Sequence, residues 1–409
     1  MGYFSVWPFF PEIGLLLAIV STPLFRVADS PPIPTSSRVE NFDGLRGFLA
    51  LCVFFHHAAT YQQYWRYGTW GYPPSRFYGL LGRDGVCVFF MITGFLFYSQ
   101  LLKAKGRPDW KKLYIGRIFR ILPLYWFAVA LVLLGVVLHT GWHLNVSSPS
   151  LLAQLARWSA GGIFGKVPIN GYADTARLIV YVTWSLRFEW IFYLSLIVLA
   201  LPTQSRLIGL LLPPALLCMA IVLELLAAQP TPLILVALFL IGMSTAAFRE
   251  ANPGFRIRGV LSGIAVIIFF ILSFDIFPRL YRPLPLLMLG VAFFLIAIGE
   301  DLFGLLSSGP AKRLGNISYG IYLLQGPVFA ATFAFSSIRA FELSSPIAHF
   351  CVSMLAATAL IALATLAHAF IERPGIDLGR RLVSKSDATG SLAPLQALET
   401  SESSQNLVG

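Results

Sequence analysis

Charge is scarce in this chain. Asp, Glu, Lys and Arg together make up 12% of its 409 residues, whereas soluble domains carry about 25%. Hydrophobic residues make up 57% of the chain, and its mean hydropathy is +0.74. This composition argues against a soluble globular protein and is typical of a polytopic membrane protein, whose expected surroundings are a lipid bilayer.

Acidic residues are especially few, 19 against 30 Lys and Arg, so the formal net charge is +11. In a soluble protein this excess would suggest a nucleic-acid partner. Here the basic residues are scattered between apolar runs and form no single patch, so we expect no nucleic acid. Seven of the 30 lie in residues 103–120. Because cytosolic loops are rich in Lys and Arg, this segment predicts an N-terminus outside the membrane and a cytosolic C-terminus.

Cysteine is rare as well, and its four copies all lie in apolar stretches: Cys52, Cys87, Cys218 and Cys351. No Cys-x-x-Cys pair or Cys/His pattern accompanies them, which argues against a zinc site and a disulfide framework. We therefore expect no metal cofactor, and we interpret the cysteines as small buried hydrophobic residues.

Eleven apolar runs are long enough to cross a bilayer, which takes about 20 helical residues. They lie at about 9–25, 44–62, 79–102, 118–139, 180–201, 207–226, 232–248, 259–277, 283–299, 316–336 and 347–371. The predicted fold class is therefore all-α, a polytopic transmembrane helical bundle of about 11 spans. The long outside loop at 140–179 is rich in Gly and Ser; we expect a short helix near Leu151–Trp158 and a role as a lid or binding element.

Arg46 and His57 are separated by ten residues, none of them charged. At about 100° per residue, eleven steps bring the two side chains to nearly the same helix face, roughly 16 Å apart along the axis. A cation at a membrane edge and an imidazole deep in the same span are costly, which indicates a functional site. A neutral imidazole there is suited to take a proton from a hydroxyl group. His56 points about 100° away, so we expect it to pack or hydrogen-bond beside His57.

Glu189 and two arginines are further candidates. A carboxylate near the outer end of a span should face the bundle interior, where Glu189 would orient the His57 imidazole; the alternative is a structural Arg–Glu pair between spans. Arg117 and Arg120 lie three residues apart at the cytosolic mouth of a span. Two guanidinium groups there could hold phosphates, or could simply anchor the helix on its cytosolic side.

Other polar residues accompany these candidates. Arg83 and Asp84 open the third span and either lie at the membrane interface or line the outer mouth. Arg187 is two residues from Glu189, so on a helix the two point in different directions. Asp43 directly precedes Gly44, and we expect it to cap the start of a helix.

Several motifs occur in a fixed order along the chain. They are Asp43-Gly-Leu-Arg-Gly47, His56-His57, Phe89-Phe-Met-Ile-Thr-Gly-Phe95, Arg117-x-x-Arg120, Trp184-Ser-Leu…Glu189, Ile317-Ser-Tyr-Gly-Ile-Tyr-Leu323 and Ile371-Glu-Arg-Pro374. Over roughly residues 40–375 this set resembles the acyltransferase-3 family, membrane-embedded O-acyltransferases of bacteria and some eukaryotes. The resemblance implies a ten-helix core that takes an acyl group, usually acetyl, from cytosolic acyl-CoA to a hydroxyl of a surface carbohydrate or related acceptor.

The resemblance also implies site residues. It places the cofactor side at Arg46, Arg117 and Arg120, and catalysis at His57 and Glu189. The candidates for the substrate side are His56, Arg83, Asp84, Trp184, Ser185 and Arg187. Two departures stand out: many relatives have a His where this chain has Gln325, and the usual pair of acidic residues is here Glu189-Trp190.

The chain is divided accordingly. Residues 1–26 are predicted to form an extra N-terminal transmembrane span, 27–40 a Pro- and Ser-rich cytosolic linker, 41–375 the acyltransferase-3-like membrane domain and 376–409 a disordered cytosolic tail.

The expected function is transfer of an acetyl group from cytosolic acetyl-CoA, with His57 as base or as acyl carrier. The expected acceptor is a cell-surface or lipid-linked glycan, such as O-antigen of lipopolysaccharide, exopolysaccharide or an oligosaccharide, at a bacterial inner membrane. A secondary metabolite such as a macrolide is an alternative acceptor. A transporter or flippase of a polar solute is the alternative function, because buried His, Glu and Arg can also form a proton relay.

Overall fold

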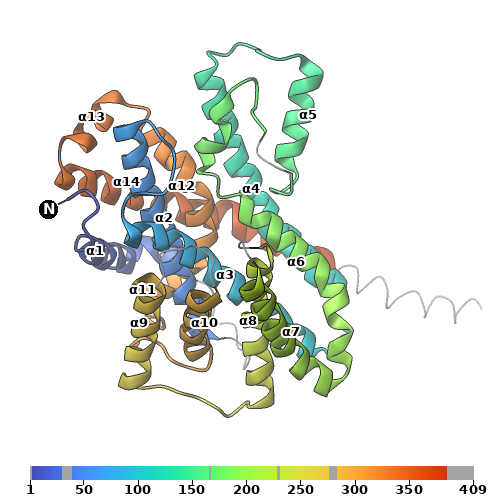
Figure 1. Cartoon of the computed structure of the whole chain (residues 1–409). Coiled ribbons are helices and arrows are strands. Elements are labelled where there is room, and N and C mark those ends of the chain that lie inside the picture. Colours follow the sequence, from blue (N-terminus) through green and yellow to red (C-terminus); the bar gives the residue numbers. More distant parts are fainter. Residues whose placement is uncertain (1, 30–38, 165–166, 228–230, 276–282, 385–409) are drawn as a thin grey trace, which may run out of the picture.

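A computed structural model describes residues 2–29, 39–164, 167–227, 231–275 and 283–384 (Figure 1). These residues are almost entirely helical and contain no β-strand beyond one isolated bridge. The longer helices are α1 (Phe9–Ser21), α2 (Glu40–Tyr67), α3 (Arg76–Lys103), α4 (Trp110–His139), α5 (Ser148–Ser159), α6 (Trp184–Ala200), α7 (Arg206–Leu226), α8 (Leu233–Ala251), α9 (Val260–Asp275), α10 (Pro283–Ala297), α11 (Gly309–Asn316), α12 (Ser318–Thr332), α13 (Ser336–Ser344) and α14 (Pro346–Ala367). Short turns of helix are η1 (Pro23–Ala28), η2 (Ala173–Ile179), η3 (Pro202–Gln204) and η4 (His368–Glu372).

The predicted all-α class is confirmed, and each predicted span overlaps a helix. Among the described residues, five helices are long and apolar enough to cross a membrane, or up to seven if two bent helix pairs each count as one span. Helix α2 is not in this set, because both of its ends are polar. Its first turns carry Asp43 and Arg46, and its second half carries His56, His57, Gln62 and Gln63. Helices α1, α9 and α10 are apolar but shorter.

Helix α2 lies at the centre of the bundle, against α3, α11 and α12 (Figure 1). Two glycines bring its first turns against α11 and the loop before it. A Cβ added to Gly44 would lie 2.0 Å from the Leu306 carbonyl oxygen, and one added to Gly315 would lie 1.8 Å from the Asp43 oxygen. The backbones therefore touch directly, which fixes the position of Arg46. The helix begins at Glu40, so the predicted capping role of Asp43 is wrong.

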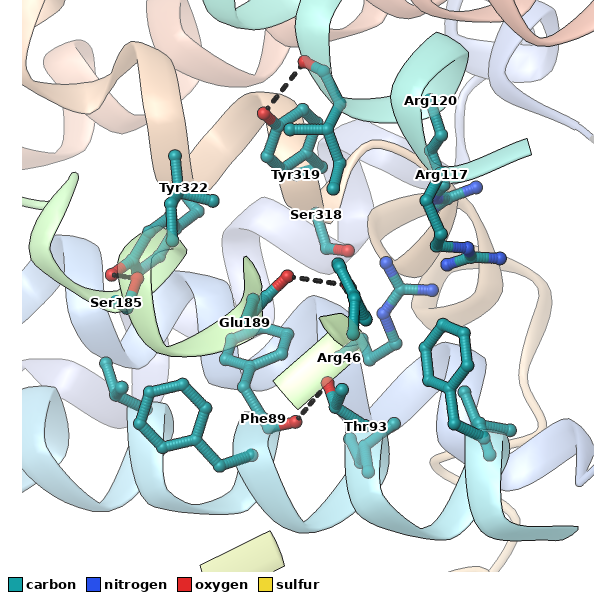
Figure 2. Close-up of a pocket in the computed structure, with 18 residues that line it drawn as sticks. Arg46, Phe89, Thr93, Arg117, Arg120, Ser185, Glu189, Ser318, Tyr319 and Tyr322 are labelled. Carbon is teal, nitrogen blue, oxygen red and sulfur yellow. Dashed lines mark hydrogen bonds between the residues drawn. The ribbon is translucent and has the colours of Figure 1, made fainter. Parts of the chain in front are cut away.

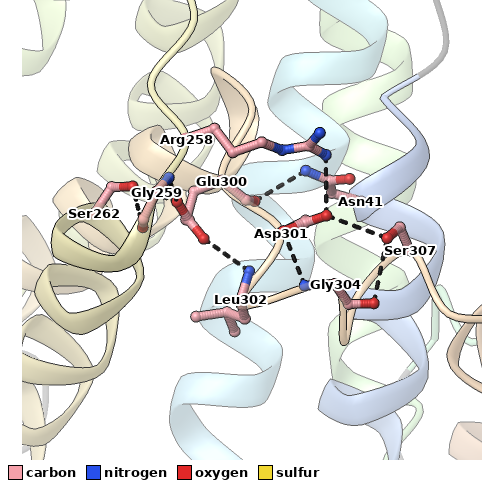
Figure 3. Close-up of polar contacts among 9 residues, drawn as sticks. All are labelled: Asn41, Arg258, Gly259, Ser262, Glu300, Asp301, Leu302, Gly304 and Ser307. Atoms are coloured by element: carbon pink, nitrogen blue, oxygen red, sulfur yellow. Dashed lines mark hydrogen bonds and ion pairs between the residues drawn. The ribbon is translucent and has the colours of Figure 1, made fainter.

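A polar cluster ties the start of α2 to the loop between α10 and α11 (Figure 3). The Asn41 side-chain amide donates to the Glu300 carbonyl oxygen at 2.9 Å. The Glu300 carboxylate accepts from the backbone N–H groups of Gly259 and Leu302, and Arg258 pairs with Asp301 at 2.9 Å. Glu300 thus satisfies an N–H at the start of α9, where carboxylates are favourable. The cluster anchors α2 five residues before Arg46.

The chain continues as a helix beyond α14. The π-helical turn η4 leads into helical residues as far as Ser384. Gly375 and Gly379 let this segment pack closely against Phe119 of α4. The predicted disordered tail, 376–409, is therefore helical in its first part. Residues 385–409, like 30–38 of the predicted linker, lie outside the described residues.

The predicted short helix in the loop after α4 is confirmed as α5. Its Trp158 is buried: the indole N–H donates to the Val167 carbonyl oxygen, and the Trp158 carbonyl accepts from the Tyr125 hydroxyl at 2.7 Å. The loop then passes through η2 and returns to the bundle at α6 (Figure 1). Trp158 therefore ties the C-terminal end of α5 to α4, whereas most other side chains of α5 are exposed or half-buried.

Candidate active site

Three of the predicted arginines face one cavity of about 220 Å³, which we name the arginine cavity. Arg46 comes from α2, and Arg117 and Arg120 come from α4. Glu189 and Ser185 of α6 line the same cavity, together with residues of α3 and α12. Figure 2 shows the arginines grouped on one side, Ser185 on the other and Glu189 between them. The structure thus brings together residues that lie up to 276 positions apart in the sequence, from Arg46 to Tyr322.

The arginine cavity carries more positive than negative charge. Glu189 lines it and accepts a hydrogen bond from the Tyr193 hydroxyl at 2.9 Å. Arg117 lies over the Phe97 ring, 4.9 Å from its centroid. Arg120 pairs with Glu372 at 3.7 Å. Guanidinium groups bind phosphate oxygens with two parallel hydrogen bonds, so three of them around one cavity suit a polyphosphate.

Glu372, which does not line the cavity, is the carboxylate that faces Arg120. It belongs to the Ile371-Glu-Arg-Pro374 motif and lies in the π-helical turn η4, fully buried. Its carboxylate also contacts Nδ1 of His368 at 3.1 Å. Such π-helical turns often occur at functional sites. Glu372 therefore places a buried carboxylate at ion-pair distance from Arg120.

His56 and His57 face a second cavity, which we name the histidine cavity. Its inner part has a volume of about 80 Å³ and is lined by Tyr72, Arg83 and Trp184. It continues into a more open part of about 270 Å³, next to the loops that join α2 to α3 and η2 to α6. This end of α2 is opposite to the end that carries Arg46.

A thin wall separates the two cavities. Val86 and Tyr322 line both of them. The Tyr322 hydroxyl and Ser185 Oγ are 2.8 Å apart, and the Tyr322 hydroxyl also donates to the Val182 carbonyl oxygen at 3.1 Å. Within this wall, the Tyr322 side chain is held in place by α6 and by the turn before it.

Hydrogen bonds define the protonation of the His57 ring. The Gln325 amide N–H donates to the Tyr322 carbonyl oxygen at 2.7 Å. The amide oxygen must then face the ring, where it lies 3.0 Å from His57 Nδ1. Because an amide oxygen only accepts, Nδ1 carries the proton and Nε2 keeps its lone pair. Among the described residues no hydrogen bond engages Nε2, so this atom is suited to accept a proton from a substrate.

The predicted pairing of Glu189 with His57 is wrong. Glu189 lines the arginine cavity, and no hydrogen bond or ion pair joins it to His57 in the described part of the chain. The reason is that Glu189 and His57 lie at different heights along the helix bundle. Helix α6 begins at Trp184, level with the histidine cavity. Glu189 lies five residues further on, about 7.5 Å along the axis. Gln325 occupies the place that the sequence suggested for a carboxylate.

The remaining predicted residues lie in different places. Trp184 lines the histidine cavity, and Ser185 lies at the wall. Arg83 lines the inner histidine cavity and forms an ion pair with Asp84, and both side chains are buried in the protein. Arg187 is exposed and lines neither cavity.

His56 packs beside His57 as expected, with ring centroids 4.9 Å apart. Its Nδ1 lies 2.9 Å from the Tyr78 carbonyl oxygen, so Nδ1 carries the proton here too. Gly82 gives the ring its space, because a Cβ at this position would lie 2.4 Å from it.

The site contains residues to which sequence reasoning gave no role. Tyr319 and Tyr322 line the arginine cavity, and Gln325 bonds to His57. All three lie on α12 at intervals of three residues, which places them along one face. The signal was present in Ile317-Ser-Tyr-Gly-Ile-Tyr-Leu323, whose two tyrosines have helical spacing.

Two curated proteins are similar to this chain. "Putative peptidoglycan O-acetyltransferase YrhL" of Bacillus subtilis (strain 168) is 26% identical over 374 residues, which cover 82% of this chain and 54% of that protein. "Nodulation protein 10" of Rhizobium leguminosarum bv. viciae is 26% identical over 180 residues, 40% of this chain and 44% of that protein. The chain thus spans about half the length of these relatives.

The family comparison covers most of the chain. No solved structure matches the chain significantly. The model of the acyltransferase-3 family, described as an acyltransferase domain, matches residues 39–366, from the start of α2 to the end of α14. With its long apolar helices the protein is an integral membrane protein. The chain belongs to the acyltransferase-3 family.

Proposed function

We propose that the protein is a membrane O-acyltransferase that takes an acetyl group from cytosolic acetyl-CoA to a hydroxyl of a carbohydrate on the opposite side of the membrane. The arrangement that carries this proposal is the pair of cavities: an arginine cavity and a histidine cavity lie back to back and share Val86 and Tyr322 as their wall. One suits a polyphosphate donor and the other suits an acceptor whose hydroxyl must lose a proton.

The arginine cavity is assigned to the donor. Arg46, Arg117 and Arg120 would bind the phosphates of acetyl-CoA by charge-assisted hydrogen bonds. Arg117 and Arg120 belong to the Lys- and Arg-rich segment 103–120, which favours a cytosolic opening. The thioester then has to pass the wall at Tyr322 to reach the histidine cavity.

The histidine cavity is assigned to the transfer step. His57 Nε2 accepts the proton of the acceptor hydroxyl while the hydroxyl oxygen attacks the thioester carbonyl carbon. The C–S bond breaks, and the CoA thiolate takes up that proton to leave as the thiol. Alternatively Nε2 itself attacks the thioester carbonyl carbon, the C–S bond breaks and the CoA thiolate leaves. The acceptor hydroxyl then attacks the acyl-imidazole, the N–C bond breaks, and the hydroxyl proton passes to the thiolate. In both routes Gln325 keeps Nδ1 protonated.

The name of one relative supports a carbohydrate acceptor, since that protein is named for peptidoglycan O-acetylation. O-antigen, exopolysaccharide and smaller oligosaccharides belong to the same chemical class. A bacterial inner membrane, with the N-terminus outside and the C-terminus in the cytosol, would place the histidine cavity on the side where such glycans are assembled.

A sided assay tests the proposal. Sealed vesicles containing the protein receive acetyl-CoA labelled in the acetyl group, either on the cytosolic or on the opposite face, with a cell-surface glycan extract as acceptor. We expect label in the glycan only when the donor is on the cytosolic face. Transfer from the opposite face would contradict the assigned orientation. Absence of any transfer, with solute uptake instead, would favour a transporter.

Replacement of Gln325 by leucine is expected to lower kcat at least about tenfold, because the His57 ring loses the partner that fixes its tautomer and orientation. The KM for acetyl-CoA should stay the same, since Gln325 does not line the arginine cavity. Steady-state kinetics on purified protein measure both constants.

A second substitution distinguishes the positioning role of Gln325 from a general effect on packing. Gln325→His retains a ring nitrogen that can accept from His57 Nδ1, and it should recover most of the lost kcat. Equal losses in Gln325→Leu and Gln325→His, at unchanged melting temperature, would contradict the role.

A further inference from the structure

Beside His57, the histidine cavity presents a second ring nitrogen that nothing else in the site uses. His56 Nδ1 is bonded to the Tyr78 carbonyl oxygen, and His57 Nδ1 is bonded to Gln325. Each ring therefore keeps the lone pair of Nε2. Both residues line both parts of the cavity, and no hydrogen bond among the described residues occupies either Nε2. The cavity thus offers two adjacent hydrogen-bond acceptors.

Aromatic side chains form the walls around these acceptors. Trp70, Tyr72, Tyr181 and Trp184 line the more open part of the cavity. The Trp70 ring is held by three other aromatic rings, with centroids 5.1 Å away at Tyr61, 5.7 Å at Tyr181 and 5.8 Å at Tyr64. A ring so fixed offers a rigid flat surface at little entropic cost. Its electron-rich face attracts the C–H groups on one face of a saturated ring.

The backbone at one edge of the cavity is strained. Val180 and Tyr181 have positive φ angles of 43° and 59°. Such a conformation is rare for residues other than glycine, and most of all for a β-branched one. It persists only where the surroundings impose it, and it is concentrated at ligand sites. Gly326 of α12 supports the turn from behind, because a Cβ there would lie 2.4 Å from Ile179 Cα. The strain places Val180 and Tyr181 at the cavity.

From these features we propose that the acceptor is a sugar ring bound through two neighbouring hydroxyls. One hydroxyl donates to His57 Nε2 and is acylated. The next hydroxyl donates to His56 Nε2 and thereby fixes which hydroxyl of the ring faces His57. The ring lies against the aromatic wall that includes Trp70. His56 is thus a specificity-determining residue that selects vicinal diols over isolated hydroxyls. The inference rests on the proposed acyl transfer, and it narrows the acceptor to a ring with adjacent free hydroxyls.

Two small acceptors test the diol directly. The purified full chain receives acetyl-CoA with either methyl β-D-xylopyranoside, which has adjacent hydroxyls, or tetrahydropyran-3-ol, which has one. We expect kcat/KM to be at least about tenfold higher for the xyloside, since a site built to bond a hydroxyl discriminates against a ligand that lacks it. Equal values for the two acceptors would overturn the inference.

Two substitutions of His56 isolate the role of Nε2. An asparagine amide can keep the donor toward the Tyr78 carbonyl oxygen but has no group at the Nε2 position, whereas a glutamine can place an oxygen acceptor there. His56→Asn should remove the preference for the xyloside, and His56→Gln should retain it. His139→Asn is the control, because His139 is exposed and lines neither cavity; its preference should equal that of the wild type.

The outcomes also separate this inference from the proposed function. If the wild type cleaves acetyl-CoA but acetylates neither acceptor, or if His56→Asn keeps the full preference for the xyloside, acyl transfer stands and the diol site is wrong. If the wild type cleaves no acetyl-CoA with either acceptor or with a surface glycan extract, the proposed function fails, and the diol site fails with it.

Discussion

Replacement of His57 by alanine is expected to lower acyl transfer by at least about 100-fold, because a general base typically contributes that much or more. The substitution removes Nε2, the ring atom that no described hydrogen bond occupies, and it releases Gln325. The measurement is transfer of labelled acetyl from acetyl-CoA to the glycan acceptor, with wild type and variant compared at equal amounts of folded protein.

Two controls make the His57 result specific. Acetyl-CoA affinity, measured by calorimetry on detergent-solubilised protein, should change little, because His57 does not line the arginine cavity. Exogenous imidazole should restore part of the transfer, since it can enter the space left by the ring. A His57→Ala protein that transfers at the wild-type rate would rule out both the base and the acyl-carrier role. Acid-quenched samples of the wild type distinguish the two routes, because only the acyl carrier leaves label on the protein.

Simultaneous replacement of Arg117 and Arg120 by alanine is expected to raise the KM for acetyl-CoA by roughly 100-fold. Hydrogen bonds to charged groups contribute about 1.5–3 kcal/mol each, and two lost bonds correspond to at least that factor. The effect on kcat should be smaller, because both arginines lie on the far side of the wall from His57. Initial rates over a range of acetyl-CoA concentrations give the two constants.

A donor that lacks phosphates provides the sharpest control for the variant without Arg117 and Arg120. S-acetylpantetheine has the same thioester and no phosphate, so wild type and variant should use it equally well. Lys103→Ala with Arg107→Ala removes two exposed cations from the same segment and should leave the KM for acetyl-CoA near the wild-type value. If the arginine variant loses as much with S-acetylpantetheine as with acetyl-CoA, the arginines act on the fold and not on the phosphates.

The sequence predicted the parts of the site that depend on local helix geometry. The apolar runs indicated the helices, and the charged residues near their ends indicated Arg46, Arg117 and Arg120, which do meet in one cavity. Burial of charge in a membrane is costly enough that a few positions stand out against an apolar background. This signal does not depend on knowledge of the tertiary structure.

The contacts between residues on different helices could not be predicted from the sequence in the same way. The depth of Glu189 depends on where α6 begins, and that is set by the strained turn at Val180 and Tyr181, which no sequence pattern announces. Gln325 looked like a departure from the family pattern, yet it bonds to His57. Its role follows from the packing of α12 against α2, a contact between residues 268 positions apart.

The wall at Tyr322 has a consequence for the energetics of the cell. In a membrane that carries a proton gradient, an open channel lined by histidine and arginine would let protons leak and would dissipate that gradient. With the arginine cavity open to the cytosol and the histidine cavity open to the other side, as proposed, Val86 and Tyr322 keep the two aqueous phases apart. On the proposed route the Tyr322 side chain would move aside for one acetyl group and close again, so that acyl transfer would not open a path for protons.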